Sequence, residues 1–212
     1  MLLFNDSPTM PGTGESPEAR LARAVPLFGT PGQDYVEKRG IPVRLAHDAH
    51  VRFDPDWHGR AALLVPMKDA AGNLCSVHGR YLAHAGDQNK MLTIGPGGGV
   101  VSVMDGLRRD SIILVEGLFD ALTLALCGYG SVATVGRWAP WLPEACAGKT
   151  VWLAFDGNRP GEVTTMRYKQ SLIGADTRRL PPPGRSKDWN TALVNRGRAT
   201  VEAWLRRHLS EG

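Results

Sequence analysis

The sequence contains little cysteine and no long apolar run. Its three cysteines, Cys75, Cys127 and Cys146, include no Cys-x-x-Cys pair, which argues against a disulfide framework and against a zinc ribbon. No apolar stretch approaches the roughly 20 residues needed to cross a bilayer. The N-terminus also lacks the basic start and long apolar segment of a signal peptide. We therefore expect a cytoplasmic protein that does not act at a membrane.

The glycine cluster GPGGG at 95–99 lacks the Lys-Ser/Thr pair that follows the glycines of a P-loop. Its backbone could approach a phosphate closely. Glycine clusters more often form loops, so we expect a flexible connection between two strands. The P-loop class of nucleotide-binding proteins is not indicated.

The bulk composition is that of an ordinary globular protein. The chain has 212 residues, of which 42% are hydrophobic and 22% are charged, and this length suits one domain or two small ones. The formal net charge is +4 and the pI is about 9.1. A basic excess of this size is a weak indication of a nucleic-acid partner.

The first half of the chain predicts a small α+β subdomain over residues 17–108. Residues 1–16 are rich in Pro, Gly, Ser and Thr and are typical of a disordered lead-in. Helices are expected at 17–29, ended by Gly29, and at 33–40, ended by Gly40. Strands are expected at AALLVPM, LCSVHGRYL, MLTI and VVSVM.

The second half, residues 109–212, alternates strands with helices. The expected strands are SIILVEG, SVATVG, TVWLAFDGN and the start of DTRRLPPPG. The expected helices are LFDALTLALCGYG, WLPEACAG, GEVTTMRYKQSLIG, DWNTALVNRG and TVEAWLRRHL. This alternation predicts an α/β fold with a parallel, doubly wound sheet.

Acidic residues follow the expected strands of this sheet. Glu116 comes after SIILV, Asp156 after TVWLAF and Asp188 after the strand and loop DTRRLPPPGRSK. Asp120 lies one helical turn beyond Glu116, on the same helix face. Ligands of open parallel sheets collect at the carboxyl ends of the strands, and converging carboxylates suit Mg²⁺, which prefers oxygen ligands. The pattern predicts a magnesium site.

Each acid also has a purely local explanation. Glu116 and Asp120 could favour the start of a helix through its dipole. Asp156, Gly157 and Asn158 could form a plain turn, and Asp188 could cap the helix DWNTAL. Their joint order and their positions at strand ends favour the metal site, although the local explanations stay open.

The motifs together resemble the TOPRIM domain of bacterial, DnaG-like primases. VEGLFDALTLALCGYG followed by LAFDGNRPG resembles the TOPRIM signature, with SVATVG as its middle strand, and KDWNTAL resembles the third acidic motif. Upstream, MKDAAGNLCSVHGRYL, then Asn89 and Lys90, then the GP of GPGGG resemble the basic N-terminal part of a primase core. YVEKRGI is similar to phage- and plasmid-type TOPRIM primases. The resemblance covers about residues 17–197.

The resemblance implies a primase-like nucleotidyltransferase: a Rossmann-like TOPRIM domain preceded by the α+β subdomain. Such an enzyme uses Mg²⁺ (or Mn²⁺) to make short primers on single-stranded DNA from nucleoside triphosphates. The implied catalytic acids are Glu116, Asp120 and Asp156. The implied metal ligands are Glu116, Asp156, Asn158 and Asp188. The implied contacts to template or triphosphate are Arg80, Lys90 and Arg159.

Two departures from the family pattern keep other functions open. Asn158 stands where the family has a second aspartate, and an amide oxygen without charge should bind a metal more weakly. No zinc-binding module precedes the core and no helicase follows it, so a separate zinc-binding domain or a helicase is an expected partner. A TOPRIM module that only binds nucleic acid and a TOPRIM nuclease are the alternatives. The first-half motifs favour a primase over a nuclease.

Overall fold

The computed structural model describes residues 15–83 and 88–209. The expected lead-in, 1–16, therefore lies outside the described residues except for its last two positions. The chain divides into two compact units, and each is described here by itself. The antiparallel-sheet unit consists of the described part of Leu3–Val101 together with Val135–Ala139. The parallel-sheet unit consists of Ser102–Thr134 and the described part of Pro140–Gly212.

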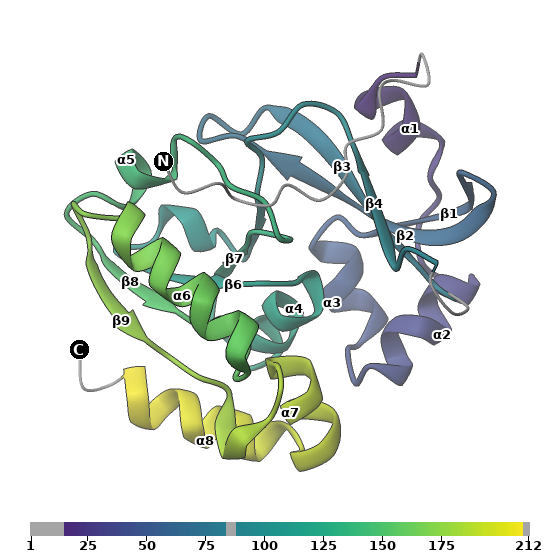
Figure 1. Cartoon of the computed structure of the whole chain (residues 1–212). Coiled ribbons are helices and arrows are strands. Elements are labelled where there is room, and N and C mark those ends of the chain that lie inside the picture. The colour runs from purple at the N-terminus through teal and green to yellow at the C-terminus, as the bar shows by residue number, and fades with distance from the viewer. Residues whose placement is uncertain (1–14, 84–87, 210–212) are drawn as a thin grey trace. The chain divides into compact units, whose positions relative to one another are not determined.

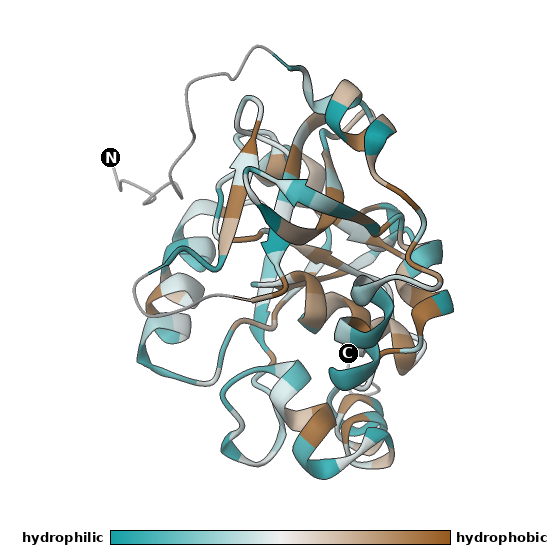
Figure 2. Cartoon of the chain, turned by 90° about the vertical axis from the view of Figure 1, so that its right-hand side faces the viewer, coloured by the Kyte–Doolittle hydropathy of each residue, from teal (hydrophilic) through white to brown (hydrophobic). Residues whose placement is uncertain are grey.

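The antiparallel-sheet unit contains a four-stranded meander of order β1-β2-β3-β4 (Figure 1). Its strands are β1 (Arg52–Trp57), β2 (Arg60–Lys68), β3 (Leu74–Tyr81) and β4 (Met91–Ile94). Its helices are α1 (Pro17–Arg23), α2 (Pro31–Lys38) and α3 (Val43–Asp48). Apolar strand residues, brown in Figure 2, supply the core around the fully buried Trp57. The Trp57 ring lies against Gly79 of β3, where any side chain would collide with it.

Two features of this half differ from what the sequence predicted. The first helix ends at Arg23 rather than Gly29, because Val25 forms a β-bridge with Phe53 and Pro26 follows. Strand β1 was not expected, since its Pro55 cannot donate to a ladder. The glycine cluster forms the expected connection between two strands, and a Cβ at Gly95 or Gly99 would collide there with the backbone of neighbouring strands.

The parallel-sheet unit is built on five strands in the order β5-β7-β6-β8-β9. The strands are β5 (Val101–Val103), β6 (Ser111–Val115), β7 (Ser131–Ala133), β8 (Thr150–Leu153) and β9 (Asp176–Arg179). The pairs β6/β7, β6/β8 and β8/β9 are parallel, which confirms the predicted α/β class. Strand β5 joins this sheet, and the two units divide at 101/102, after the first residue of β5.

Five α-helices and two short 3₁₀ helices of the described chain belong to this unit. They are η1 (Gly106–Arg108), α4 (Leu118–Leu126), α5 (Leu142–Cys146), α6 (Arg159–Ser171), η2 (Pro183–Arg185), α7 (Trp189–Arg196) and α8 (Arg198–Leu209). The expected ends of α4 at Gly128 and of α5 at Gly148 were confirmed, and Gly197 likewise follows α7; all three glycines adopt positive φ. Helix α4 is almost wholly buried and packs on α7 and β7.

The connections of the parallel sheet turn in opposite directions at β6 and β8. From β6 the chain crosses through α4 to β7 on one side, and from β8 it crosses through α6 to β9 on the other. Because such crossovers are right-handed, α4 and α6 cover opposite faces of the sheet; Figure 1 shows α6 in front of the strands. The carboxyl ends of β6 and β8 therefore mark the switch point where open α/β sheets bind ligands.

Candidate functional site

Glu116 and Asp156 lie at this switch point. Strands β6 and β8 are direct neighbours, with Leu114 opposite Leu153. Glu116 comes two residues after Leu114, and Asp156 comes three residues after Leu153. Both residues therefore lie at the carboxyl ends of their strands, on the same side of the sheet. Both are half-buried. The two acids predicted from the strand ends thus lie together at the carboxyl ends of β6 and β8.

One acidic cluster contains Glu116, Asp156 and Asp188, whose side chains lie close enough to interact electrostatically. Burial raises the pKa of Glu116, and the negative charges of Asp156 and Asp188 raise it further. Burial and the charge of Asp188 likewise raise the pKa of Asp156. Lys187 opposes both shifts, so a lysine that sequence reasoning missed faces the same acids. A cluster whose members repel one another is stabilised by a cation.

Asp120 is buried beneath these acids and is bound to two backbone segments. Its Oδ2 accepts a hydrogen bond from the Gly117 amide at 3.2 Å and its Oδ1 accepts one from the Asn190 amide at 3.2 Å. Burial, followed by the charges of Asp188 and Asp156, raises the pKa of Asp120 to about 8. Asp120 therefore ties the loop after β6 to the start of α7. This geometry favours a positioning role over the predicted catalytic one.

Asp188 caps a helix, as its local explanation anticipated, and Asn158 also caps a helix, whereas a plain turn had been expected there. Asp188 Oδ1 accepts from the Thr191 amide at 2.6 Å, at the start of α7. Asn158 Oδ1 accepts from the Gly161 amide at 2.9 Å, at the start of α6. The Asn158 amide nitrogen also donates to Asp156 Oδ2 at 3.3 Å. Capping uses one oxygen of Asp188, whereas Asn158 uses its oxygen for the cap of α6 and its amide nitrogen to contact Asp156.

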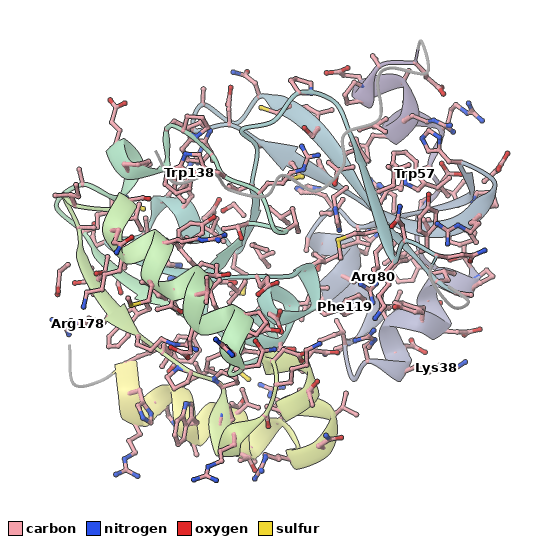
Figure 3. The ribbon with its side chains drawn as sticks, viewed as in Figure 1. Lys38, Trp57, Arg80, Phe119, Trp138 and Arg178 are labelled. Carbon is pink, nitrogen blue, oxygen red and sulfur yellow. The ribbon has the colours of Figure 1, made fainter. Side chains whose placement is uncertain are left out.

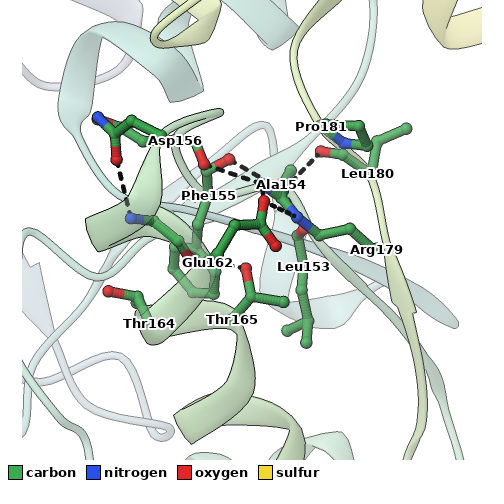
Figure 4. A network of polar contacts seen from close by, with 12 residues as sticks. Leu153, Ala154, Phe155, Asp156, Glu162, Thr164, Thr165, Arg179, Leu180 and Pro181 are labelled. Atoms are coloured by element: carbon green, nitrogen blue, oxygen red, sulfur yellow. Dashed lines mark hydrogen bonds and ion pairs between the residues drawn. The ribbon is translucent and has the colours of Figure 1, made fainter. Parts of the chain in front are cut away.

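The end of β8 is held by two side chains that sequence reasoning did not single out. Arg179 of β9 donates to the carbonyl oxygens of Leu153, Phe155 and Asp156 (Figure 4). Trp189 of α7 donates from Nε1 to the Ala154 carbonyl at 2.8 Å. The sequence held one indication of this contact. Neighbouring residues of a strand point to opposite faces of the sheet, so Arg178 and Arg179 could not both lie on the same face.

The predicted basic contacts fall in different units. Arg80 (labelled in Figure 3) and Lys90 belong to the antiparallel-sheet unit. Arg80 Nε donates to the Tyr35 hydroxyl at 3.5 Å, and Lys90 is exposed. Arg159 is the first residue of α6 in the parallel-sheet unit and is exposed. Arg159 therefore lies next in sequence to the Asp156–Asn158 turn. The roles of all three remain predictions.

The donor chemistry of the acidic cluster fits a hard cation. Glu116, Asp156 and the second oxygen of Asp188 offer anionic oxygen, the donor that Mg²⁺ prefers, and their mutual repulsion is relieved by such an ion. Over residues 15–83 and 88–209, no group of three or more His, Cys, Asp or Glu side chains is placed so that it could hold a metal ion by itself. A cation here would thus complete its coordination with water or with substrate oxygens.

Comparison with known families assigns both halves of the chain. Residues 15–101 match a family described as a domain of unknown function, DUF7146. Residues 113–193, from β6 into α7, match the Toprim-like family. The parallel-sheet unit contains a Toprim-like domain. This match confirms the family suggested by the sequence motifs, and the roles of Glu116, Asp156 and Asp188 within the domain stay predictions.

Solved structures of primases match most of this chain. The zinc-binding and RNA polymerase domains of Aquifex aeolicus primase match with a TM-score of 0.64 at 19% identity, over 87% of this chain and 61% of that one. A DnaG primase catalytic domain bound to single-stranded DNA matches with a TM-score of 0.67 at 19% identity, over 90% of this chain and 77% of that one. The primase fragment of the bacteriophage T7 primase-helicase matches with a TM-score of 0.60 at 19% identity, over 86% of this chain and 80% of that one.

These matches identify the fold as that of a DnaG-type primase catalytic core, a Toprim-like domain with an N-terminal subdomain. The chain spans 61% of the length of the Aquifex aeolicus chain. A search of curated proteins returned no match. Among the described residues, no helix is both long and apolar enough to span a bilayer.

Proposed function

We propose that this protein is a primase-like nucleotidyltransferase that joins nucleotides into short primers on single-stranded DNA, with Mg²⁺ or Mn²⁺ as its cofactor. The observation that carries the proposal is the placement of Glu116 and Asp156 side by side at the switch point of a Toprim-like sheet. The solved relatives support it, since one of them binds single-stranded DNA.

The residues divide the chemistry as follows. Asp156 and Asp188 would hold the cation, and Glu116 would either complete its coordination or accept the proton of the attacking hydroxyl. Burial and nearby charges raise the pKa of Glu116 toward neutral pH, and a general base works best when its pKa lies near the working pH. A bound ion would supply positive charge for the triphosphate and for the attacking and leaving oxygens. Asp120 and Asn158 keep these acids in place, and Arg159 would contact phosphate.

A primer-synthesis assay tests this function. The full chain is incubated with single-stranded DNA, nucleoside or deoxynucleoside triphosphates and Mg²⁺ or Mn²⁺, and products are resolved by length. We expect short products that disappear in Asp156→Asn, a variant of the same shape without the charge. No product with either metal and with either kind of triphosphate would overturn the proposal.

A module that only binds nucleic acid is the second candidate, favoured by the neutral Asn158 and its capping bonds. It predicts that DNA is retained but never extended. The nuclease alternative predicts a shortened template in the same reaction. One gel with labelled template therefore separates all three functions.

A further inference from the structure

The guanidinium of Arg179 lies under the end of β8, the strand that presents Asp156 (Figure 4). Its Nη1 donates to the carbonyl oxygens of Leu153 and Phe155, both at 2.9 Å, and its Nη2 donates to that of Asp156 at 2.8 Å. These carbonyl groups lie at or beyond the last pair of the β8/β9 ladder. Buried backbone carbonyl oxygens need hydrogen-bond donors, and here the single side chain of Arg179 donates to three carbonyl oxygens.

The peptide group between Asp156 and Gly157 is held at both of its ends. Arg179 binds its carbonyl oxygen, and its N–H donates to the Lys187 carbonyl at 2.7 Å. Trp189 holds the Ala154 carbonyl. Every backbone carbonyl from Leu153 to Asp156 thus accepts a bond from a side chain. With the peptide plane fixed on two sides, the direction in which the Asp156 side chain leaves the backbone is fixed as well.

Glu162 keeps the guanidinium in this position. Its Oε1 accepts from Arg179 Nε at 3.1 Å and from Nη2 at 2.5 Å. Glu162 lies in the first turn of α6, the helix that follows Asp156. The Glu162 side chain is 57% exposed, so the ion pair itself contributes little stability. Its effect is to orient the planar fork, whose donors then match the carbonyl groups.

We propose that Arg179 is a positioning residue for Asp156, with Glu162 orienting the guanidinium. The catalytic consequence rests on the function proposed above, whereas the positioning itself does not. Lysine cannot substitute fully, because one ammonium group cannot reach three carbonyls and a carboxylate in the same plane.

The test compares Arg179→Met and Arg179→Lys with the matched control Arg178→Met. Arg178, labelled in Figure 3, precedes Arg179 in β9, but it pairs with Asp176 at 2.9 Å and lies over the Trp152 ring. It touches no carbonyl at the end of β8 among its described contacts. Arg179→Lys keeps the charge and serves if Arg179→Met fails to fold.

Amide hydrogen exchange of the protein without metal or DNA gives the first readout. We expect exchange of the Gly157 amide to rise by about tenfold or more in Arg179→Met and by less in Arg179→Lys. Amides in β6 and the Arg178→Met control should not change. Unchanged exchange at Gly157, or an equal rise throughout the sheet, would overturn the proposal.

The second readout is the dissociation constant of Mg²⁺, measured below the melting temperature of every variant. Arg179→Met should weaken Mg²⁺ binding by about tenfold, and the same change in an Asp156→Asn background should have no further effect. An equal effect in both backgrounds would show that Arg179 does not act through Asp156. If the wild-type chain binds no Mg²⁺ and makes no primers, the proposed function falls, and hydrogen exchange still decides the role of Arg179.

Discussion

At the scale of single residues, Asn158 performs two tasks through one side chain: its oxygen caps α6 and its amide nitrogen holds Asp156. Asn158→Asp keeps the cap, because aspartate caps helices equally well. It replaces the donated hydrogen bond with repulsion between two carboxylates. We expect the metal-free variant to lose about 0.5–1.5 kcal/mol of stability and to bind Mg²⁺ more tightly than the wild type.

Thermal melts with and without Mg²⁺ check this prediction, since a ligand of the folded state raises its stability. The magnesium-induced shift should be larger for Asn158→Asp than for the wild type. Asn158→Ser is the control, because serine also caps a helix and adds no charge. Equal shifts in all three proteins would show that position 158 does not face the cation.

Asp120 makes the stability of the fold depend on pH. Burial raises its pKa from 3.8 to about 8, so between these values the folded chain holds a proton that the unfolded chain has released. Stability therefore falls as pH rises through this window, by up to ~1.4 kcal/mol per pH unit. The raised pKa values of Glu116 and Asp156 act in the same direction.

Asp120→Asn removes this titration. Asparagine cannot accept both backbone hydrogen bonds, so the variant should be less stable at low pH, but its stability should fall less steeply with pH. Urea unfolding at pH ~5, ~6.5 and ~8 measures both slopes. Parallel slopes for the two proteins would contradict a buried, protonated Asp120.

At the scale of helices and strands, local patterns in the sequence predict what local physics determines. The strands β6, β7 and β8 and the glycine-terminated helices α4, α5 and α7 were expected from apolar runs and C-terminal glycines. Strand β1 was not, because Pro55 interrupts its pattern and its place depends on pairing with β2. The short helix α3 carries no side-chain cap to announce it.

The contact between Gly79 and Trp57 tests the packing of the antiparallel sheet. A Cβ at Gly79 would lie 2.1 Å from Trp57 Nε1, and the fully buried ring has little room to move. We expect Gly79→Ala to destabilise this unit by about 1–3 kcal/mol. Gly97→Ala is the control, since nothing lies within 4 Å of its added methyl group. Equal urea midpoints for both variants would contradict the packing.

At the scale of the whole molecule, sequence reasoning placed the acids but not what holds them. Glu116, Asp156 and Asp188 follow strands or cap a helix, so their positions could be read along the chain. The bonds of Arg179 to the end of β8 and of Asp120 to the Asn190 amide join segments 23 to 70 residues apart. Such contacts depend on the order of strands in the sheet, which no local pattern records.

The net charge of +4 and the predicted basic contacts concern the whole molecule, because DNA binding sums over every phosphate contact. If Arg80 and Lys90 contact phosphates, each alanine substitution should weaken binding of single-stranded DNA similarly across sequences. Each should also reduce the slope of log K against log salt by about 1. Titrations of labelled single-stranded DNA at several salt concentrations measure both quantities.

Arg44→Ala is the matched control for this experiment. Arg44 belongs to the same unit, its side chain is 77% exposed, and it pairs with Asp48 on its own helix. Its loss changes the net charge by the same amount as the loss of Arg80 or Lys90. A general effect of charge would therefore lower the salt slope equally in all three variants, whereas phosphate contacts would lower it only for Arg80 and Lys90. Equal slopes would place the DNA elsewhere on the protein.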